Sequence, residues 1–165
     1  MIIGVQHTCI HVSDIEKSLA FYRDVLGLRE RYRMKVGPSP EVDKVTGVKG
    51  SRLKIVHLEA GKGDGIELIE YVTPKGKRIH RDQQDVGNLH IAFYVDDIRK
   101  TYGQLVKKGV KFVSPPNEFN EGPETGWIMC YFNDPDGVLL ELVEQRYWWS
   151  VQKGVEEYHH LAREP

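Results

Sequence analysis

The sequence has few cysteines, no long apolar runs and no excess of charge of either sign. Its 165 residues include two cysteines, Cys9 and Cys130, and neither lies in a metal-binding or redox motif. So few cysteines count against a disulfide-stapled fold and are typical of a protein kept reduced. No apolar run approaches a membrane span, and the opening MIIGVQHTCIHV is too short and too polar for a signal peptide. We therefore expect a soluble, cytoplasmic protein with no membrane partner.

The charge balance counts against nucleic acid as a partner. Lys and Arg number 23 against 24 Asp and Glu, which gives a formal net charge of -1 and no global basic field. One basic run, KGKRIHR at 75–81, is local. A solvated linker is the favoured interpretation of this run, and an anion-binding patch is the alternative. With 40% hydrophobic residues, the chain is long enough for one compact domain or two small halves that share a core.

Two motifs occur twice, in the same order. Residues 7–17 read HTCIHVSDIEK and residues 90–100 read HIAFYVDDIRK, so His7 aligns with His90. Residues 66–70 read IELIE and residues 140–144 read LELVE, so Glu67 aligns with Glu141. Repetition of this kind indicates that one supersecondary unit was duplicated.

Each repeat is predicted to fold as strand, helix, strand, strand, strand. The first helix should begin with a capping box of Ser13 and Glu16 and end at Gly27, and the second should end at Gly109. The expected elements of the first unit are strand 5–12, a helix to residue 26, strand 29–34, loop 35–50, strand 53–59, turn 61–65 and strand 66–72. Those of the second unit are strand 89–95, helix 97–108 and strands 110–114, 127–133 and 138–144.

These elements predict an α+β fold of paired βαβββ modules. The expected organisation is a first module at 1–74, a linker at 75–87, a second module at 88–145 and a C-terminal helical tail at 146–165. The tail has no counterpart in the first half, so its aromatic residues should pack on the body or on a partner.

A carboxylate in the middle of a core strand needs a compensating partner. Side chains alternate along a strand, so Glu67 should share one face with Ile69 and Tyr71, while Glu70 points to the other face. A buried carboxylate without a partner costs several kcal/mol. A metal cation on the face of Glu67 would remove that cost.

Four residues at matched positions of the repeat could supply such a metal site. His7 and His90 lie on the first strand of each unit, and Glu67 and Glu141 lie on the last. If the units pair by pseudo-twofold symmetry, two imidazoles and two carboxylates converge, a ligand set suited to a divalent first-row metal. The alternative for each residue alone is a satisfied core histidine, or a glutamate paired with Lys or Arg.

The other histidines are weaker candidates. His11 shares a strand face with His7 and could contact a substrate. The remaining ones are most simply surface or packing residues: His57, His80, His159 and His160.

The two repeated motifs resemble the vicinal oxygen chelate superfamily, which includes glyoxalase I, methylmalonyl-CoA epimerase, extradiol dioxygenases and fosfomycin-resistance proteins. The matching segments are HTCIHVSDIEKSLAFYRDVLGL, GIELIEY, HIAFYVDDI and DPDGVLLELVE, within residues 5–145. The resemblance implies that the paired βαβββ modules form a curved mixed sheet around a metal site. It implies further that one divalent ion (Ni, Co, Zn, Mn or Fe) is bound by His7, Glu67, His90 and Glu141, as in the bacterial type of glyoxalase I. It also leads us to expect a small-molecule substrate and a homodimer, with the site formed within one chain or between swapped modules.

The sequence departs from the better-known members at informative positions. Glyoxalase I typically has an arginine, used to hold glutathione, where this chain has His11. The epimerase has a catalytic glutamate where this chain reads GVKGSRL, which contains no carboxylate. Extradiol dioxygenases bind Fe(II) with two His and one Glu, so a fourth ligand at Glu67 counts against that activity.

We therefore expect a divalent-metal-dependent isomerase, epimerase or lyase that acts on a small carbonyl compound or thioester. The metal would stabilise an enediolate or enolate, and either Glu67 or Glu141 would serve as the base. The first alternative is an Fe(II)-dependent extradiol ring-cleaving dioxygenase. The second is a non-catalytic protein that binds and sequesters a small molecule.

Overall fold

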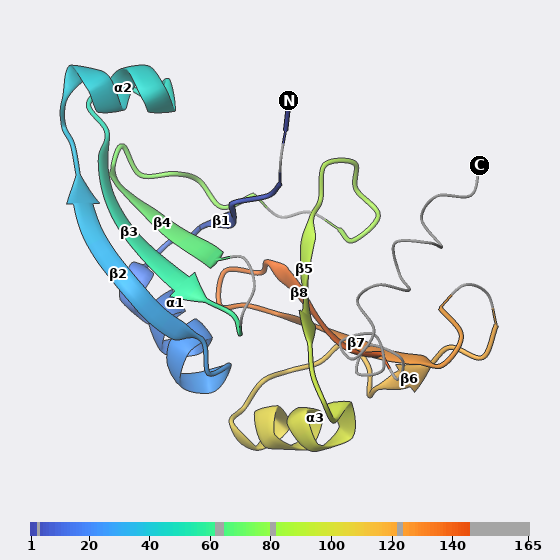
Figure 1. Cartoon of the computed structure of the whole chain (residues 1–165). Coiled ribbons are helices and arrows are strands. Elements are labelled where there is room, and N and C mark those ends of the chain that lie inside the picture. Colours follow the sequence, from blue (N-terminus) through green and yellow to red (C-terminus); the bar gives the residue numbers. More distant parts are fainter. Residues whose placement is uncertain (3, 62–64, 80–81, 122–123, 146–165) are drawn as a thin grey trace. The chain divides into compact units, whose positions relative to one another are not determined.

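The computed structural model describes residues 1–2, 4–61, 65–79, 82–121 and 124–145 of the chain (Figure 1). Two compact units are present. Among the described residues, the first comprises Met1–His90 and Asn133–Leu140, and the second comprises Ile91–Phe132 and Glu141–Gln145. The helical tail predicted at 146–165 lies outside the described residues. No helix in the described part of the chain is long and apolar enough to cross a membrane.

The first sheet has four strands in the order β1-β4-β3-β2. Strand β1 pairs in parallel with β4, while β2 with β3 and β3 with β4 are antiparallel, so the sheet is mixed. The strands are β1 (His7–His11), β2 (Arg29–Val36), β3 (Arg52–Glu59) and β4 (Gly65–Thr73). Between β1 and β2 lie the helix α1 (Ile15–Leu19) and a π-helical segment (Ala20–Val25).

Strand alternation divides the first sheet into a buried face and a more open face. On β4, Ile66, Leu68 and Glu70 are buried, whereas Glu67 and Ile69 are only partly so. Helix α1 packs against β3 and β4, where it buries Ile15 and Leu19 (Figure 1). The predicted placement of Glu67 and Glu70 on opposite faces is therefore confirmed, and Glu67 lies on the face away from α1.

The start of α1 differs from the predicted capping box. Asp14 is the N-cap, and its carboxylate accepts hydrogen bonds from the backbone amides of Glu16 and Lys17. Ser13 instead donates from its amide and its hydroxyl to Asp136, at 2.7 and 2.6 Å. Either residue type can cap a helix, and the neighbouring carboxylate at position 136 offers Ser13 a stronger acceptor.

A short helix occupies part of the segment predicted as loop 35–50. Helix α2 (Pro40–Thr46) begins after Ser39, whose hydroxyl accepts from the amide of Val42, and has proline in its first turn. It ends at Gly47, which adopts the left-handed conformation at φ 69°. Ser39, Pro40 and Gly47 are ordinary signals for the start and end of a helix. The segment was predicted as a loop because its glycines and prolines are also typical of loops.

The second sheet repeats the strand order of the first, β5-β8-β7-β6. Helix α3 (Ile98–Lys107) lies between the first two strands in chain order, as predicted. The strands are β5 (His90–Tyr94), β6 (Asn117–Glu118), β7 (Trp127–Asn133) and β8 (Leu139–Gln145). The α+β class and the paired βαβββ order are confirmed. The strand predicted at 110–114 is not formed: only one isolated β-bridge, between Phe112 and Phe132, occurs in that segment. A regular pairing with β7 is made instead by β6, a few residues later in the chain.

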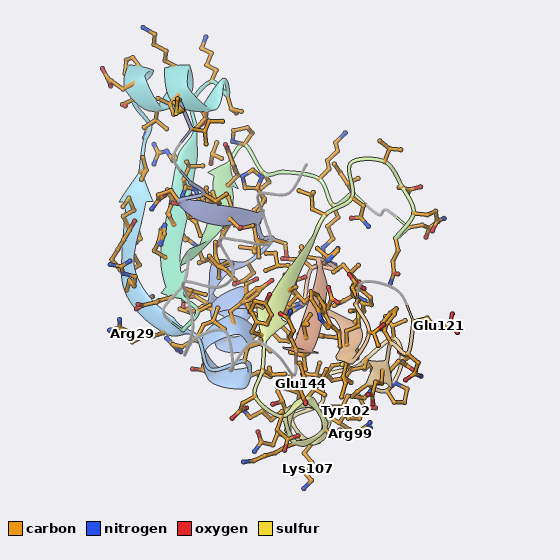
Figure 2. The ribbon with its side chains drawn as sticks, turned by 45° about the vertical axis from the view of Figure 1, so that its right-hand side comes forward. Arg29, Arg99, Tyr102, Lys107, Glu121 and Glu144 are labelled. Carbon is orange, nitrogen blue, oxygen red and sulfur yellow. The ribbon has the colours of Figure 1, made fainter. Side chains whose placement is uncertain are left out.

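The second glutamate of each repeated strand binds the first amide of its helix. The amide of Ile15 donates to Glu70 at 3.0 Å, and the amide of Ile98 donates to Glu144 at 2.9 Å. Figure 2 shows Glu144 directed at α3. Because the first helical amides lack partners within the helix, each carboxylate satisfies one of them and fixes the helix to its sheet.

The turn between β7 and β8 is part of the first compact unit, and side chains of that unit bind its two aspartates. The buried hydroxyl of Tyr22 donates to Asp134 at 3.0 Å, and Ser13 and Arg78 donate to Asp136. Burial raises the pKa of Asp134 and, together with the Asp134 carboxylate, that of Tyr22. The DPDG sequence therefore forms a tight turn and also accepts side-chain hydrogen bonds through both of its carboxylates.

Candidate metal centre

His7 and Glu67, predicted as ligands, lie next to each other on the open face of the first sheet. Their strands β1 and β4 are parallel neighbours, and His7 Nε2 is 3.5 Å from Glu67 Oε2. Two ligands that bind one ion at about 2.1 Å and subtend about 90–110° lie roughly 3.0–3.4 Å apart, so this spacing suits shared coordination. The two side chains are 33% and 17% exposed, which leaves the pair accessible.

The neighbouring Gln6 orients the His7 ring. His7 Nδ1 and Gln6 Oε1 are hydrogen-bond partners, and because an amide oxygen can only accept, this pairing requires the tautomer with the imidazole proton on Nδ1. The lone pair of Nε2 is then directed at the space beside Glu67. Histidines that bind metals commonly donate their other ring N–H in this way, so the His7 environment fits a ligand.

His57, interpreted from the sequence as a surface or packing residue, belongs to this site. It pairs in register with Glu67 across β3 and β4, and its Nε2 is 3.8 Å from Glu67 Oε1. The residue is 4% exposed. Its ring stacks on Tyr32 at a centroid distance of 5.0 Å and meets the His7 ring edge to face at 5.5 Å.

The register of the β3–β4 pairing explains why His57 was missed. Only a hairpin register that places residue 57 opposite residue 67 brings this ring to Glu67, and a shift of one residue would move it to the other face. The glycine-rich turn at 61–65 predicts a hairpin but leaves its register open.

The Cys9 thiol also lies beside Glu67. Cys9 is the parallel-register partner of Glu67 on β1. Partial burial, followed by the charge of the Glu67 carboxylate, raises the pKa of the thiol to about 11. At neutral pH the side chain is therefore a neutral thiol and not a nucleophilic thiolate.

His90 and Glu141, the other two predicted ligands, lie on neighbouring strands of the second sheet. His90 opens β5 and is exposed, whereas Glu141 lies on β8 and is 4% exposed. The Tyr131 hydroxyl forms a hydrogen bond with Glu141, and burial together with that carboxylate raises the pKa of the tyrosine. Glu141 therefore has a tyrosine partner, whereas Glu67 has a histidine.

The described residues do not by themselves assemble a complete metal shell. Within them, no group of three or more His, Cys, Asp or Glu side chains is close enough to hold an ion. His7 and Glu67 are brought together as predicted. The four-ligand set that adds His90 and Glu141 stays a prediction.

His11, the predicted substrate contact, is exposed on the same strand as His7. Its ring meets Tyr71 edge to face at 5.5 Å. Tyr71 lies on β4, four residues after Glu67. An aromatic pair thus occupies the position where the resemblance would place an arginine.

The fold is that of an established class of proteins. The family model for the Glyoxalase/Bleomycin resistance protein/Dioxygenase superfamily matches residues 4–142, and the chain belongs to that superfamily. The resemblance that the repeated motifs carry is therefore confirmed.

Individual relatives carry different names. A probable lactoylglutathione lyase from Synechocystis sp. is 33% identical over 140 residues, 84% of this chain and 92% of the relative. A 2-epi-5-epi-valiolone epimerase from Actinomyces sp. is 26% identical over 144 residues, 86% of this chain and 79% of the relative. A glyoxalase family protein from Bacillus cereus superposes with a TM-score of 0.73 at 24% identity, over 88% of this chain and 95% of that protein. The last similarity shows the fold alone.

Proposed function

We propose that the protein is a divalent-metal-dependent lyase, isomerase or epimerase that moves a proton on a small carbonyl compound. The observation that carries the proposal is the His7–Glu67 pair, in which His7 Nε2 and Glu67 Oε2 lie 3.5 Å apart. The names of the relatives, a lyase and an epimerase, agree with this type of reaction.

His7, Glu67, His90 and Glu141 are the proposed ligands, and the donors fit a first-row ion. Two imidazole nitrogens and two carboxylate oxygens form a mixed set that suits Ni, Co, Zn, Mn or Fe. When bound, a divalent ion supplies a Lewis acid that stabilises negative charge on a substrate oxygen.

The proton transfer is assigned to a glutamate. A carboxylate within reach of a C–H beside a carbonyl can take that proton and return it to another carbon or to the other face. Glu67 and Glu141 are the candidates, and their partners differ: His57 lies across from Glu67, whereas Tyr131 forms a hydrogen bond with Glu141. A donor to a carboxylate lowers its basicity and restricts its motion, so the two glutamates should not be equivalent.

The substrate we propose is a compact hydroxy-carbonyl compound without the charges of glutathione. His11 and Tyr71 present an aromatic pair on the open face, with ring centroids 5.5 Å apart. Aromatic rings stack on an apolar or polyhydroxylated body but lack the guanidinium group with which an arginine forms two parallel hydrogen bonds to a carboxylate. This favours a substrate of the epimerase kind over a glutathione adduct.

The experiment is proton–deuterium exchange, measured by NMR in D₂O with protein loaded with Ni, Co, Zn or Mn. The probes are small hydroxy-ketones and the hemithioacetal of glutathione with methylglyoxal. We expect exchange at the carbon beside the carbonyl of a hydroxy-ketone, and slower turnover of the hemithioacetal. Oxygen uptake by the Fe(II)-loaded protein on catechols, without exchange on any carbonyl probe, would overturn the proposal in favour of ring cleavage.

A further inference from the structure

We propose that His57 is a positioning residue for Glu67: once a metal is bound, its Nε2 donates a hydrogen bond to Oε1, and His57 is not itself a metal ligand. This inference rests on the proposed metal-dependent function. It gives the two oxygens of Glu67 different tasks, because Oε2 lies beside His7 and Oε1 lies beside His57.

The His57 ring is held in place from several sides. It is 4% exposed and stacks nearly parallel on Tyr32, with an interplanar angle of 21°. Gly65 lies against its other edge: a Cβ at position 65 would come within 2.9 Å of both Cε1 and Nδ1. A side chain so confined has little rotational freedom, so the direction of its Nε2 toward Glu67 is set by packing.

The position of the imidazole proton follows from the surroundings of the two nitrogens. Nδ1 is buried and has no hydrogen-bond partner among the residues that the structure describes. A neutral imidazole carries one proton, and a proton on Nδ1 would be buried without an acceptor while the Nε2 lone pair met a carboxylate. The proton is therefore favoured on Nε2, where Glu67 can accept it.

The same observation argues against His57 as a ligand. Binding a metal through Nε2 would force the proton onto Nδ1, and histidine ligands almost always donate that proton to an acceptor. His7 meets this requirement through Gln6, whereas Nδ1 of His57 has no partner in the described part of the chain. The two rings beside Glu67 thus have opposite tautomers and opposite roles.

The separation of 3.8 Å between Nε2 and Oε1 is longer than a hydrogen bond. Hydrogen bonds in functional sites commonly shorten when a metal or substrate binds. A metal on Oε2 would fix the carboxylate and direct Oε1 at the donor, so the contact should strengthen on binding.

The first test measures the affinity for Co²⁺ or Ni²⁺ by calorimetric titration of the wild-type protein and of two variants at position 57. His57→Phe keeps the ring and the stack on Tyr32 but loses the donor, and we expect about 10–100-fold weaker binding. His57→Gln places an amide N–H near the position of Nε2, and we expect it to restore most of the lost affinity. Equal losses in both variants would indicate a ligand or a packing role, and unchanged affinity in His57→Phe would exclude any role; either result overturns the inference.

The second test needs neither metal nor a variant of His57. Long-range ¹H–¹⁵N correlation on the metal-free protein should show the proton of His57 on Nε2 and that of His7 on Nδ1. A proton on Nδ1 of His57 would overturn the inference even if no metal binds. Failure of the wild-type protein to bind any divalent ion would instead count against the proposed function, so the two failures are distinguishable. Gly65→Ala, which displaces the ring, should reproduce the affinity loss of His57→Phe.

Discussion

Glu70 accepts a hydrogen bond of 3.0 Å from the backbone amide of Ile15, the first residue of α1. The carboxylate is 8% exposed and also pairs with Lys54 Nζ at 3.0 Å. Its counterpart in the repeat, Glu144, binds the amide of Ile98 in the same way. The second glutamate of each IELIE-type motif is therefore structural, and its role is to join a helix to a sheet.

Glu70→Gln should destabilise the protein without affecting the proposed proton transfer. The amide keeps an acceptor for Ile15 but leaves Lys54 without its charge partner, so we expect a loss of about 1–3 kcal/mol in the free energy of unfolding. Urea denaturation checks this. Glu16→Gln is the matched control, since its pair with Arg33 is exposed and worth about 0–1 kcal/mol. Identical urea midpoints for Glu70→Gln and the wild-type protein would contradict the assignment.

Asp136 should make part of the stability depend on pH. Burial alone would raise the pKa of this carboxyl, but the hydrogen bonds from Ser13 and the nearby Arg78 outweigh burial and lower it. A lowered folded-state pKa contributes stability above the unfolded value of about 3.9, and that contribution is lost as pH falls through the folded pKa. Asp136→Asn should therefore be less stable than wild type at pH 7, with the difference shrinking below pH about 4.

Thermal unfolding at pH 7 and pH 3 measures this difference. Arg78→Ala removes one of the groups that lower the pKa, so the pH dependence should flatten in that variant. A stability difference between Asp136→Asn and wild type that is equal at both pH values would show that the hydrogen bonds to Asp136 do not depend on its charge.

The repeat made the architecture predictable, because matched motifs fix the order of the elements and the faces of the last strands. Glu67 and Glu70 lie on opposite faces, as their parity requires. The placement of His57 opposite Glu67 was not predictable, because it depends on the hairpin register, which the turn sequence leaves open. Likewise, no pattern in the chain predicts that Gln6 orients His7, since a polar residue before a strand has many possible partners.

Gln substitutions at the two candidate bases should separate ligand from base. An amide oxygen can still bind a metal but has almost no basicity. If one glutamate takes the proton, its Gln variant should keep metal yet lose at least about a hundredfold in turnover. The other variant should lose less, or lose metal affinity instead. Proton–deuterium exchange at the substrate carbon, measured together with the metal content, checks this. Undiminished exchange in both Glu67→Gln and Glu141→Gln would show that the base is another residue, and His11 would be the next candidate.

The most direct measurement of the central claim is the metal content of the purified protein, compared by elemental analysis with that of two histidine variants. We predict about one divalent ion per chain in the wild-type protein. His90→Ala should retain far less, because loss of one of four ligands leaves an incomplete shell. His11→Ala, on the strand of His7 but in ring contact with Tyr71, should keep its metal. Full occupancy in His90→Ala, or no metal in the wild-type protein after loading, would contradict the account.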